Sequence, residues 1–111
     1  MKSIKIGGED RPVKYNINSL IEFEELTGLE IIQAELDPKL FAKLKNMRAL
    51  AFCGLKHGFI ETSKETLPFT IEDVGKWIGF GDGSMDKFFK AFNNDSSSEI
   101  ENSEEGEAGK K

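Results

Sequence analysis

Hydrophobic and polar side chains alternate in two short stretches near the N-terminus, Ser3–Ile6 and Val13–Ile17. A period of two is typical of strands with one buried face, and residues 7–12 between the stretches contain turn-forming glycines and a proline. We therefore predict a β-hairpin here. Because an isolated two-stranded hairpin is only marginally stable in water, its apolar face must lie on helices or on another copy of the chain.

A helical pattern follows the hairpin. Ser19 and Glu22 are spaced as in a capping box, and Gly28 can adopt the left-handed conformation that ends a helix, so we predict a helix over residues 20–27. The next segment, residues 29–36, is apolar enough to be partly buried.

A second, longer helix is predicted from Asp37 to Gly58, because Asp37 and Pro38 form a start signal and Gly58 is a plausible stop. At 100° per residue, one side of this helix carries an apolar stripe that we expect to face the core. The stripe consists of Leu40, Phe41, Leu44, Met47, Ala51 and Leu55.

Two further helices are predicted near the C-terminal end. Thr70 is an N-cap residue for a helix whose inner line is Ile71, Val74 and Ile78. Three glycines in residues 79–83 break this helix, and another follows over residues 85–93. The predicted fold is therefore α+β and mostly α, with the N-terminal hairpin packed on about four helices.

The acidic character of the chain lies in its last part. Residues 95–111 hold six of the 20 acidic and two of the 15 basic residues, so this tail has a net charge of −4 and residues 1–94 have only −1. Ile100 and Ala108 are the only apolar side chains of the tail. We predict a folded domain over 1–94 and a disordered acidic tail or linker over 95–111.

Several partners and sites are not expected. Residues 1–94 have no excess of basic side chains to neutralise phosphates, so we expect no nucleic-acid partner. No apolar run approaches the ~20 residues that span a bilayer, and no secretory signal is recognised, so we expect no membrane association and a cytoplasmic location. Cys53 is the single cysteine and His57 the single histidine, too few for a zinc site. We expect no metal and no cofactor.

Catalytic residues are not evident either. Cys53 and His57 lie four positions apart on one helix face, a spacing that a nucleophile and its base could use. We favour the interpretation in which the two residues do not react together. Cys53 is then a small side chain of the helix, and His57 lies near the C-terminal end of the helix, where its charged form suits the helix dipole. Since no triad, phosphate loop or pair of convergent carboxylates is found, we expect that the protein is not an enzyme.

Two charged residues fall on apolar helix faces. Arg48 lies between Leu44 and Leu55 on its helix, and Glu24 lies beside Leu20 on the first helix. A buried charge is costly unless it is paired, so we predict a structural ion pair between Glu24 and Arg48. The alternative is that Arg48 is a binding residue in a groove.

The last predicted helix carries a dense apolar stripe, at positions i, i+3, i+4 and i+7: Met85, Phe88, Phe89 and Phe92. Two interpretations stay open. The helix packs on its own domain, or it binds a partner groove or a second subunit with residues 79–83 as a hinge. As a hypothesis, these four residues are a partner-binding site, and a homo-oligomer is one form of it.

Three segments of the chain resemble the tail assembly chaperones of long-tailed, siphovirus-like bacteriophages and prophages. They are Leu20–Gly28, Lys45–Leu55 and Thr70–Ile78; the hairpin-like start resembles the family as well, and the resemblance covers about residues 4–78. The positions that carry it are Phe23, Glu24, Leu26, Gly28, Arg48, Leu50, Phe52, Val74 and Ile78. In that family these positions are fold residues.

The resemblance implies a function in virion assembly. A chaperone of this family binds the tape-measure protein in the bacterial cytoplasm and helps tail-tube subunits assemble around it. The family also implies a longer form made by ribosomal frameshifting, and Gly109-Lys110-Lys111 is compatible with a slippery adenine-rich codon run. The tail would then be the linker to that extension.

A different function is the main alternative. The chain would be a small acidic regulatory or inhibitory protein that sequesters one partner enzyme through its Phe-rich C-terminal helix. Both functions require protein binding rather than catalysis.

Overall fold

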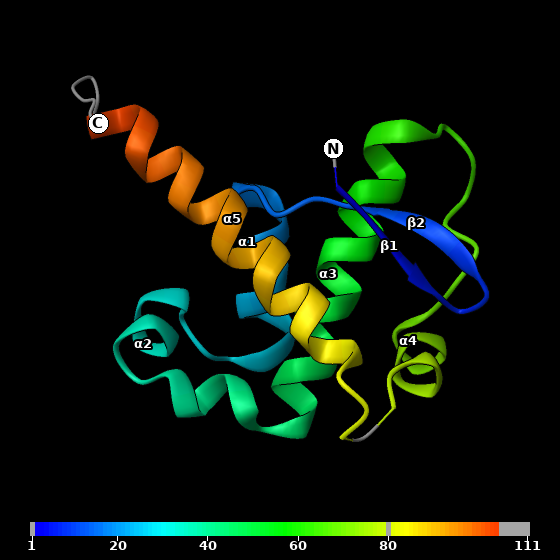
Figure 1. The fold of residues 1–111 in the computed structure, drawn as a ribbon, viewed down its shortest axis with the longest axis horizontal. Helices are drawn as coiled ribbons and strands as arrows, with labels where there is room; N and C mark the ends of the chain where they lie inside the picture. The colour runs from blue at the N-terminus through cyan, green and yellow to red at the C-terminus, as the bar shows by residue number, and fades with distance from the viewer. Residues whose placement is uncertain (1, 80, 105–111) are drawn as a thin grey trace.

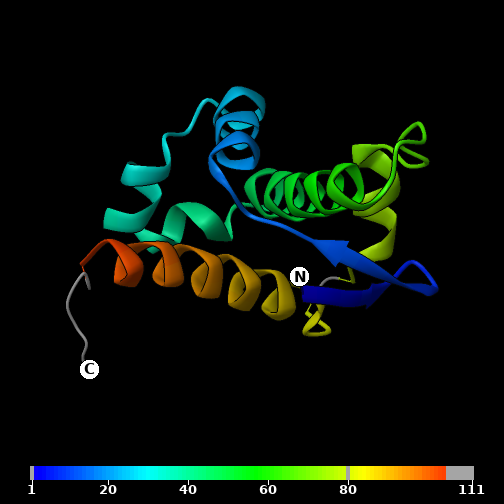
Figure 2. The ribbon, with the colours of Figure 1, turned by 90° about the horizontal axis from the view of Figure 1, so that it is seen from above.

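A computed structural model describes the backbone of residues 2–79 and 81–104 and the side chains of residues 2–79 and 81–95. In chain order the elements are β1 (Lys2–Ile6), β2 (Glu9–Val13), α1 (Ile17–Thr27), α2 (Ile31–Leu36), the 3-10 helix η1 (Pro38–Ala42), α3 (Leu44–Thr62), α4 (Ile71–Trp77) and α5 (Ser84–Glu104). The predicted α+β, mostly helical fold with an N-terminal hairpin is confirmed. Helix α3 runs through the middle, with α1 on one side and α5 on the other (Figures 1 and 2).

The hairpin forms, but its second strand begins earlier than predicted. Gly7 and Gly8 have φ angles of 62° and 84°, as a two-residue turn with two left-handed positions requires. Ile6 therefore pairs with Glu9 in an antiparallel ladder that ends at Val13. The rest of the predicted strand leads into α1 instead.

Helix α1 begins three residues before its predicted start. Asn16 is the N-cap, and its side chain accepts a hydrogen bond of 3.0 Å from the backbone N–H of Ser19. The Ser19 hydroxyl accepts in return from the Asn16 N–H at 2.7 Å, so Ser19 belongs to the capping box from inside the helix. Gly28 ends the helix at a φ of 74°, as predicted.

The long helix predicted from Asp37 to Gly58 is divided. Asp37 does cap a helical segment with Pro38 at its start, but this segment is η1, and Lys43 then takes an extended conformation before α3. Helix α2 was not predicted at all. Gly58 does not stop α3, which continues for another turn to Thr62.

The glycines of α3 allow the hairpin to approach the helix closely. A Cβ atom on Gly58 would overlap the backbone carbonyl of Pro12 in β2. One turn earlier, the Gly54 carbonyl accepts a 3.0 Å hydrogen bond from the Lys14 N–H. The core around this contact is formed by Ile4, Ile6, Val13, Tyr15, Phe23, Leu50, Leu55, Phe69, Val74, Phe88 and Phe92 among others.

Arg11 fastens the hairpin to α4. Its guanidinium carbon lies 4.2 Å from the centre of the Trp77 ring, and its Nε donates a 2.9 Å hydrogen bond to the Ile6 carbonyl. Helix α4 begins as predicted, with a reciprocal capping box between Thr70 and Asp73. These contacts fix α4 beside the N-terminal half of α3.

Helix α5 is longer than the sequence indicates. It starts at Ser84 and continues to Glu104, so the backbone of residues 95–104, predicted to be disordered, is helical. Neither glycine nor proline occurs between these ends, so no residue in the segment breaks a helix. Asp95 accepts a 3.0 Å hydrogen bond from the Tyr15 N–H, which ties the helix to the chain after β2. The expectations for residues 105–111 lie outside the described residues.

Candidate functional site: an apolar groove

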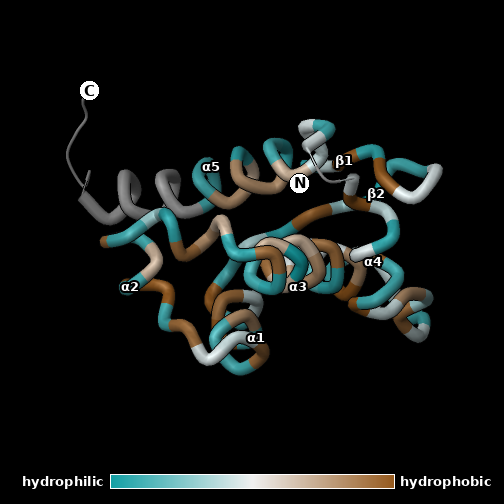
Figure 3. The backbone as a smooth tube through the Cα atoms, turned by 90° about the horizontal axis from the view of Figure 1, so that it is seen from below, coloured by the Kyte–Doolittle hydropathy of each residue, from teal (hydrophilic) through white to brown (hydrophobic). Residues whose placement is uncertain are grey.

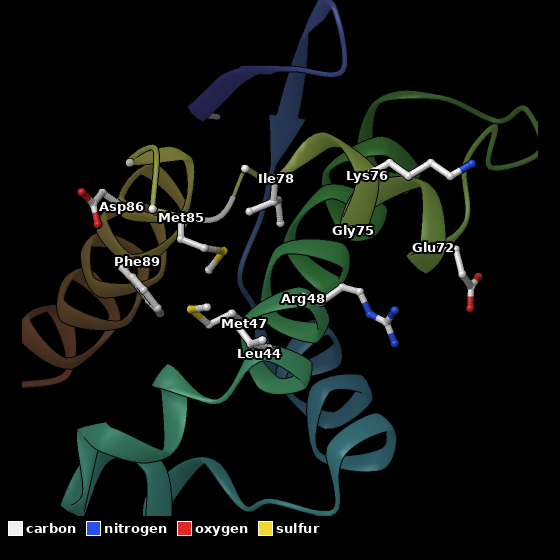
Figure 4. A pocket seen from close by; sticks show the side chains of 13 residues that line it. Leu44, Met47, Arg48, Glu72, Gly75, Lys76, Ile78, Met85, Asp86 and Phe89 are labelled. Carbon is white, nitrogen blue, oxygen red and sulfur yellow. The ribbon is translucent and has the colours of Figure 1, made fainter.

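A groove of about 710 Å³ opens between the start of α3, helix α4 and the start of α5 (Figure 4). Helices α4 and α5, which form its opposite sides, follow one another in the chain, and Gly79, Gly81 and Gly83 between them also line the groove. The carboxylate of Asp82 accepts hydrogen bonds from the backbone and hydroxyl of Ser84.

The floor of the groove is apolar. It is formed by Leu44, Met47, Ile78, Met85 and Phe89. Leu44 is 61% exposed, although it is a large aliphatic side chain. Methionine side chains are unbranched and polarizable, so the two of this floor can adapt to ligands of different shape.

A second hollow of about 470 Å³ continues the groove along α5. It is bordered by α2 and η1, and it shares Met47 and Phe89 with the first hollow. Phe89 is half-buried and lies between the two. The residues from Met85 to Phe92 span two turns of helix, about 10 Å, so the combined surface matches a short helical ligand in length.

Charged residues form the sides of the groove. Arg48 of α3 and Lys76 of α4 lie on one side, together with Glu72, and Asp86 of α5 lies on the other (Figure 4). The aliphatic part of Arg48 crosses α4 at Gly75, where a Cβ atom would be 3.0 Å from the Arg48 Cδ. A glycine inside a helix therefore makes room for this arginine.

The predicted ion pair between Glu24 and Arg48 is not formed. Glu24 instead accepts a 2.9 Å hydrogen bond from the backbone N–H of Ile31 and so caps the start of α2. Because α2 was not predicted, this partner could not be foreseen. Arg48 is exposed beside the groove, which agrees with the alternative interpretation of its position.

The ion pair that does join α1 to α3 involves Glu22. Its two carboxylate oxygens lie 2.8 Å from Lys56 Nζ and from His57 Nε2. Partial burial raises the pKa of Glu22, but hydrogen bonds from Lys56 and His57 outweigh this effect, so that the pKa is lower than the ordinary value. The sequence gives no sign of this network, because its members are 34 and 35 residues apart.

The proposed partner-binding stripe is mostly core. Phe88 is fully buried, and Met85 and Phe92 are 8% and 4% exposed, so these three side chains hold α5 on its own domain. In this structure the helix packs on its own domain, the first of the two interpretations, and the four residues do not form one exposed surface. Of the four, Phe89 is the one that is only half-buried, and both Met85 and Phe89 line the groove.

The cysteine and the histidine do not form a reactive pair. Cys53 is buried, and desolvation raises the pKa of its thiol to about 12, so that no thiolate forms near neutral pH. His57 is bonded to Glu22 rather than to the thiol. Within residues 2–79 and 81–95, no cluster of three or more histidine, cysteine or acidic side chains could hold a metal ion.

Exposed apolar side chains elsewhere are scattered on other helices: Ile17, Ile21, Leu26, Ile32, Leu36 and Ile60. Several lie at the periphery around α1 and α2, where Figure 3 shows hydrophobic segments. Among the helices that the structure describes, none is both long and apolar enough to cross a bilayer.

Comparison with known proteins adds no assignment: no family model, no curated protein and no solved structure matches this chain.

Proposed function

We propose that this chain is a non-enzymatic assembly chaperone that binds an apolar helical segment of a client protein in the groove between α3, α4 and α5. The client is the tape-measure protein of a long-tailed phage or prophage, and the complex helps tail-tube subunits assemble around it in the bacterial cytoplasm. The phage assignment comes from the sequence resemblance alone. The binding mode comes from the groove.

The observation that carries the binding mode is an open groove whose floor is apolar and contains two methionines. Amphipathic helices bind such grooves with their apolar faces. Leu44 supports this interpretation, because it lines the groove and is 61% exposed, so that a bound apolar helix would remove its surface from water.

The resembling positions are consistent with a role in the fold. Phe23, Leu50 and Val74 are fully buried, and Gly28 is the left-handed C-cap of α1. Leu50 and Val74 belong to α3 and α4, which border the groove, whereas Leu26 and Arg48 are exposed positions of the same set. The alternative function, inhibition of an enzyme through the Phe-rich stripe, is not favoured, because Met85, Phe88 and Phe92 are buried.

Coexpression with the tape-measure protein of a long-tailed phage or prophage, which we expect to be encoded downstream of this chain, tests the proposal. We expect the chain to increase the soluble fraction of that protein and to copurify with it. Leu44→Gln should reduce both effects, because it places an amide on the groove floor. Ile60→Gln is the matched control: Ile60 lies on the same helix, is 53% exposed and does not line the groove.

Two results would contradict the proposal. One is a tape-measure protein whose solubility does not change in the presence of the wild-type chain. The other is an equal loss of copurification in the two variants, which would show that the groove is not the binding surface.

A further inference from the structure

We infer that the groove selects amphipathic helices that carry carboxylate side chains along one edge of their apolar stripe. The inference rests on the proposed function, because it specifies the chemistry of the helix that the same groove binds. It is carried by the distribution of charge around the groove, which is not symmetrical.

The cationic side is formed by Arg48 and Lys76. Both residues are exposed, and among the described residues no carboxylate lies within 4.0 Å of either charged group. Glu72 lies one turn before Lys76 on the same side without contacting either of them at that distance. This side therefore has a net charge of +1 and two cationic groups that are free to pair with a ligand.

The position of Arg48 is fixed by packing as well as by charge. Its aliphatic part lies against Gly75 of α4, so its guanidinium emerges beside α4 rather than over the groove floor. Asp86 stands across the groove on α5. A bound helix would thus meet cations along one edge and an anion along the other, and carboxylates on its α4-facing edge give the better electrostatic match.

The long-range field of the protein acts against this preference. The chain has a net charge of −5, which disfavours the approach of acidic ligands. A preference for carboxylates must therefore arise from the local contacts with Arg48 and Lys76. This opposition makes the inference easy to test, because the overall charge and the local site predict opposite results.

The test uses two synthetic helical peptides of about 14 residues with the same leucine stripe, long enough for helix formation in the bound state. They differ only along one edge, which carries glutamate in one peptide and glutamine in the other. These residues have similar helix propensity, so the cost of folding the peptide cancels. Affinities are measured by fluorescence anisotropy at low and high salt.

We expect the glutamate peptide to bind wild-type protein about five- to tenfold more tightly at low salt, from two contacts at the exposed edge of the groove. Salt should reduce this advantage. The double variant Arg48→Gln with Lys76→Gln should abolish this advantage, so that the glutamate and glutamine peptides bind the variant with equal affinity.

The matched control is Lys87→Gln with Lys90→Gln. It removes the same charge from exposed positions of α5 that do not line the groove, and the advantage should persist. Equal binding of the two peptides to wild-type protein, or equal losses in the two double variants, would overturn the inference and leave the proposed function intact. If neither peptide binds, the groove does not bind helices, and the inference is overturned together with the binding mode. The coexpression experiment then decides the client independently.

Discussion

Gly54 of α3 lies directly against Tyr15, the second residue after β2: a Cβ atom on Gly54 would be 2.5 Å from the Tyr15 hydroxyl oxygen. The hydroxyl donates a 2.7 Å hydrogen bond to the Leu50 carbonyl, one turn earlier on α3. The pair fixes the distance between the hairpin segment and the central helix. Because Tyr15 is buried and hydrogen-bonded, it cannot move aside without loss of core packing.

The first prediction follows from this contact. Gly54→Ala should lower the free energy of unfolding by about 1–3 kcal/mol, because the methyl group overpacks a buried ring. Gly75→Ala is the control: its methyl group meets only the flexible Arg48 side chain, at 3.0 Å, and alanine favours the helix. Urea denaturation of both variants measures the difference. Equal destabilisation would show that the contact with Tyr15 is not tight.

The second prediction concerns the Phe-rich stripe. Phe88→Ala should destabilise the domain by about 3–5 kcal/mol, because it leaves a cavity where the ring is fully buried. Leu36→Ala should change stability by less than about 0.5 kcal/mol, since Leu36 is 82% exposed. Thermal or urea unfolding distinguishes the two. A stable Phe88→Ala variant would revive the interpretation of α5 as a partner-binding element.

The third prediction concerns the contribution of Glu22 to stability at low pH. Its pKa is lowered in the folded state, so its contribution to stability is present above its unfolded-state pKa of about 4.5 and is lost as the pH falls through the folded-state value. Glu22→Gln should therefore cost about 1–2 kcal/mol at pH 7, where the hydrogen bonds to Lys56 and His57 are charge-assisted. The difference between variant and wild type should decrease as the pH is lowered from 7 to below 4.5. Urea titrations at the two ends of this range provide the measurement, and a pH-independent difference would contradict the charged pair.

The fourth prediction concerns the effect of Cys53 on the stability of the protein at high pH. Its pKa is raised from 9.0 to about 12 in the folded state, so the unfolded chain loses the thiol proton first and stability falls as the pH rises above 9. One such group gives a slope of up to about 1.4 kcal/mol per pH unit. Cys53→Ala should show a shallower fall than wild type between pH 9 and 11. Identical slopes would mean that the thiol is accessible, which a thiol-reactive dye at pH 8 would reveal.

The fifth prediction tests whether Glu24 and Arg48 act independently, as the absence of an ion pair between them implies. Glu24→Gln should weaken the cap of α2, whereas Arg48→Met should leave stability nearly unchanged because Arg48 is exposed. The effects should add within about 0.5 kcal/mol in the double variant, since the residues share no contact. A coupling energy clearly larger than this would support the ion pair that the sequence predicted between Glu24 and Arg48.

Local signals were sufficient for much of the fold. The hairpin, the left-handed end of α1 at Gly28 and the N-cap at Thr70 depend on residues a few positions apart, and the sequence predicted all three. Errors arose where one residue type serves two purposes. Gly58 was interpreted as a helix stop, but it accommodates the Pro12 backbone inside α3, and only the packed structure shows that neighbour.

The sequence by itself determined the fold class, the order of most elements and the amphipathic faces of the helices, because periodicity and capping act over one or two turns. The tertiary structure decided what those faces contact: that Phe88 is core, that Glu24 caps α2, and that Leu44 and Phe89 border a groove with Arg48 beside it. An apolar stripe has the same pattern whether its partner is the same domain or another protein. Only the positions of residues far apart in the chain distinguish the two.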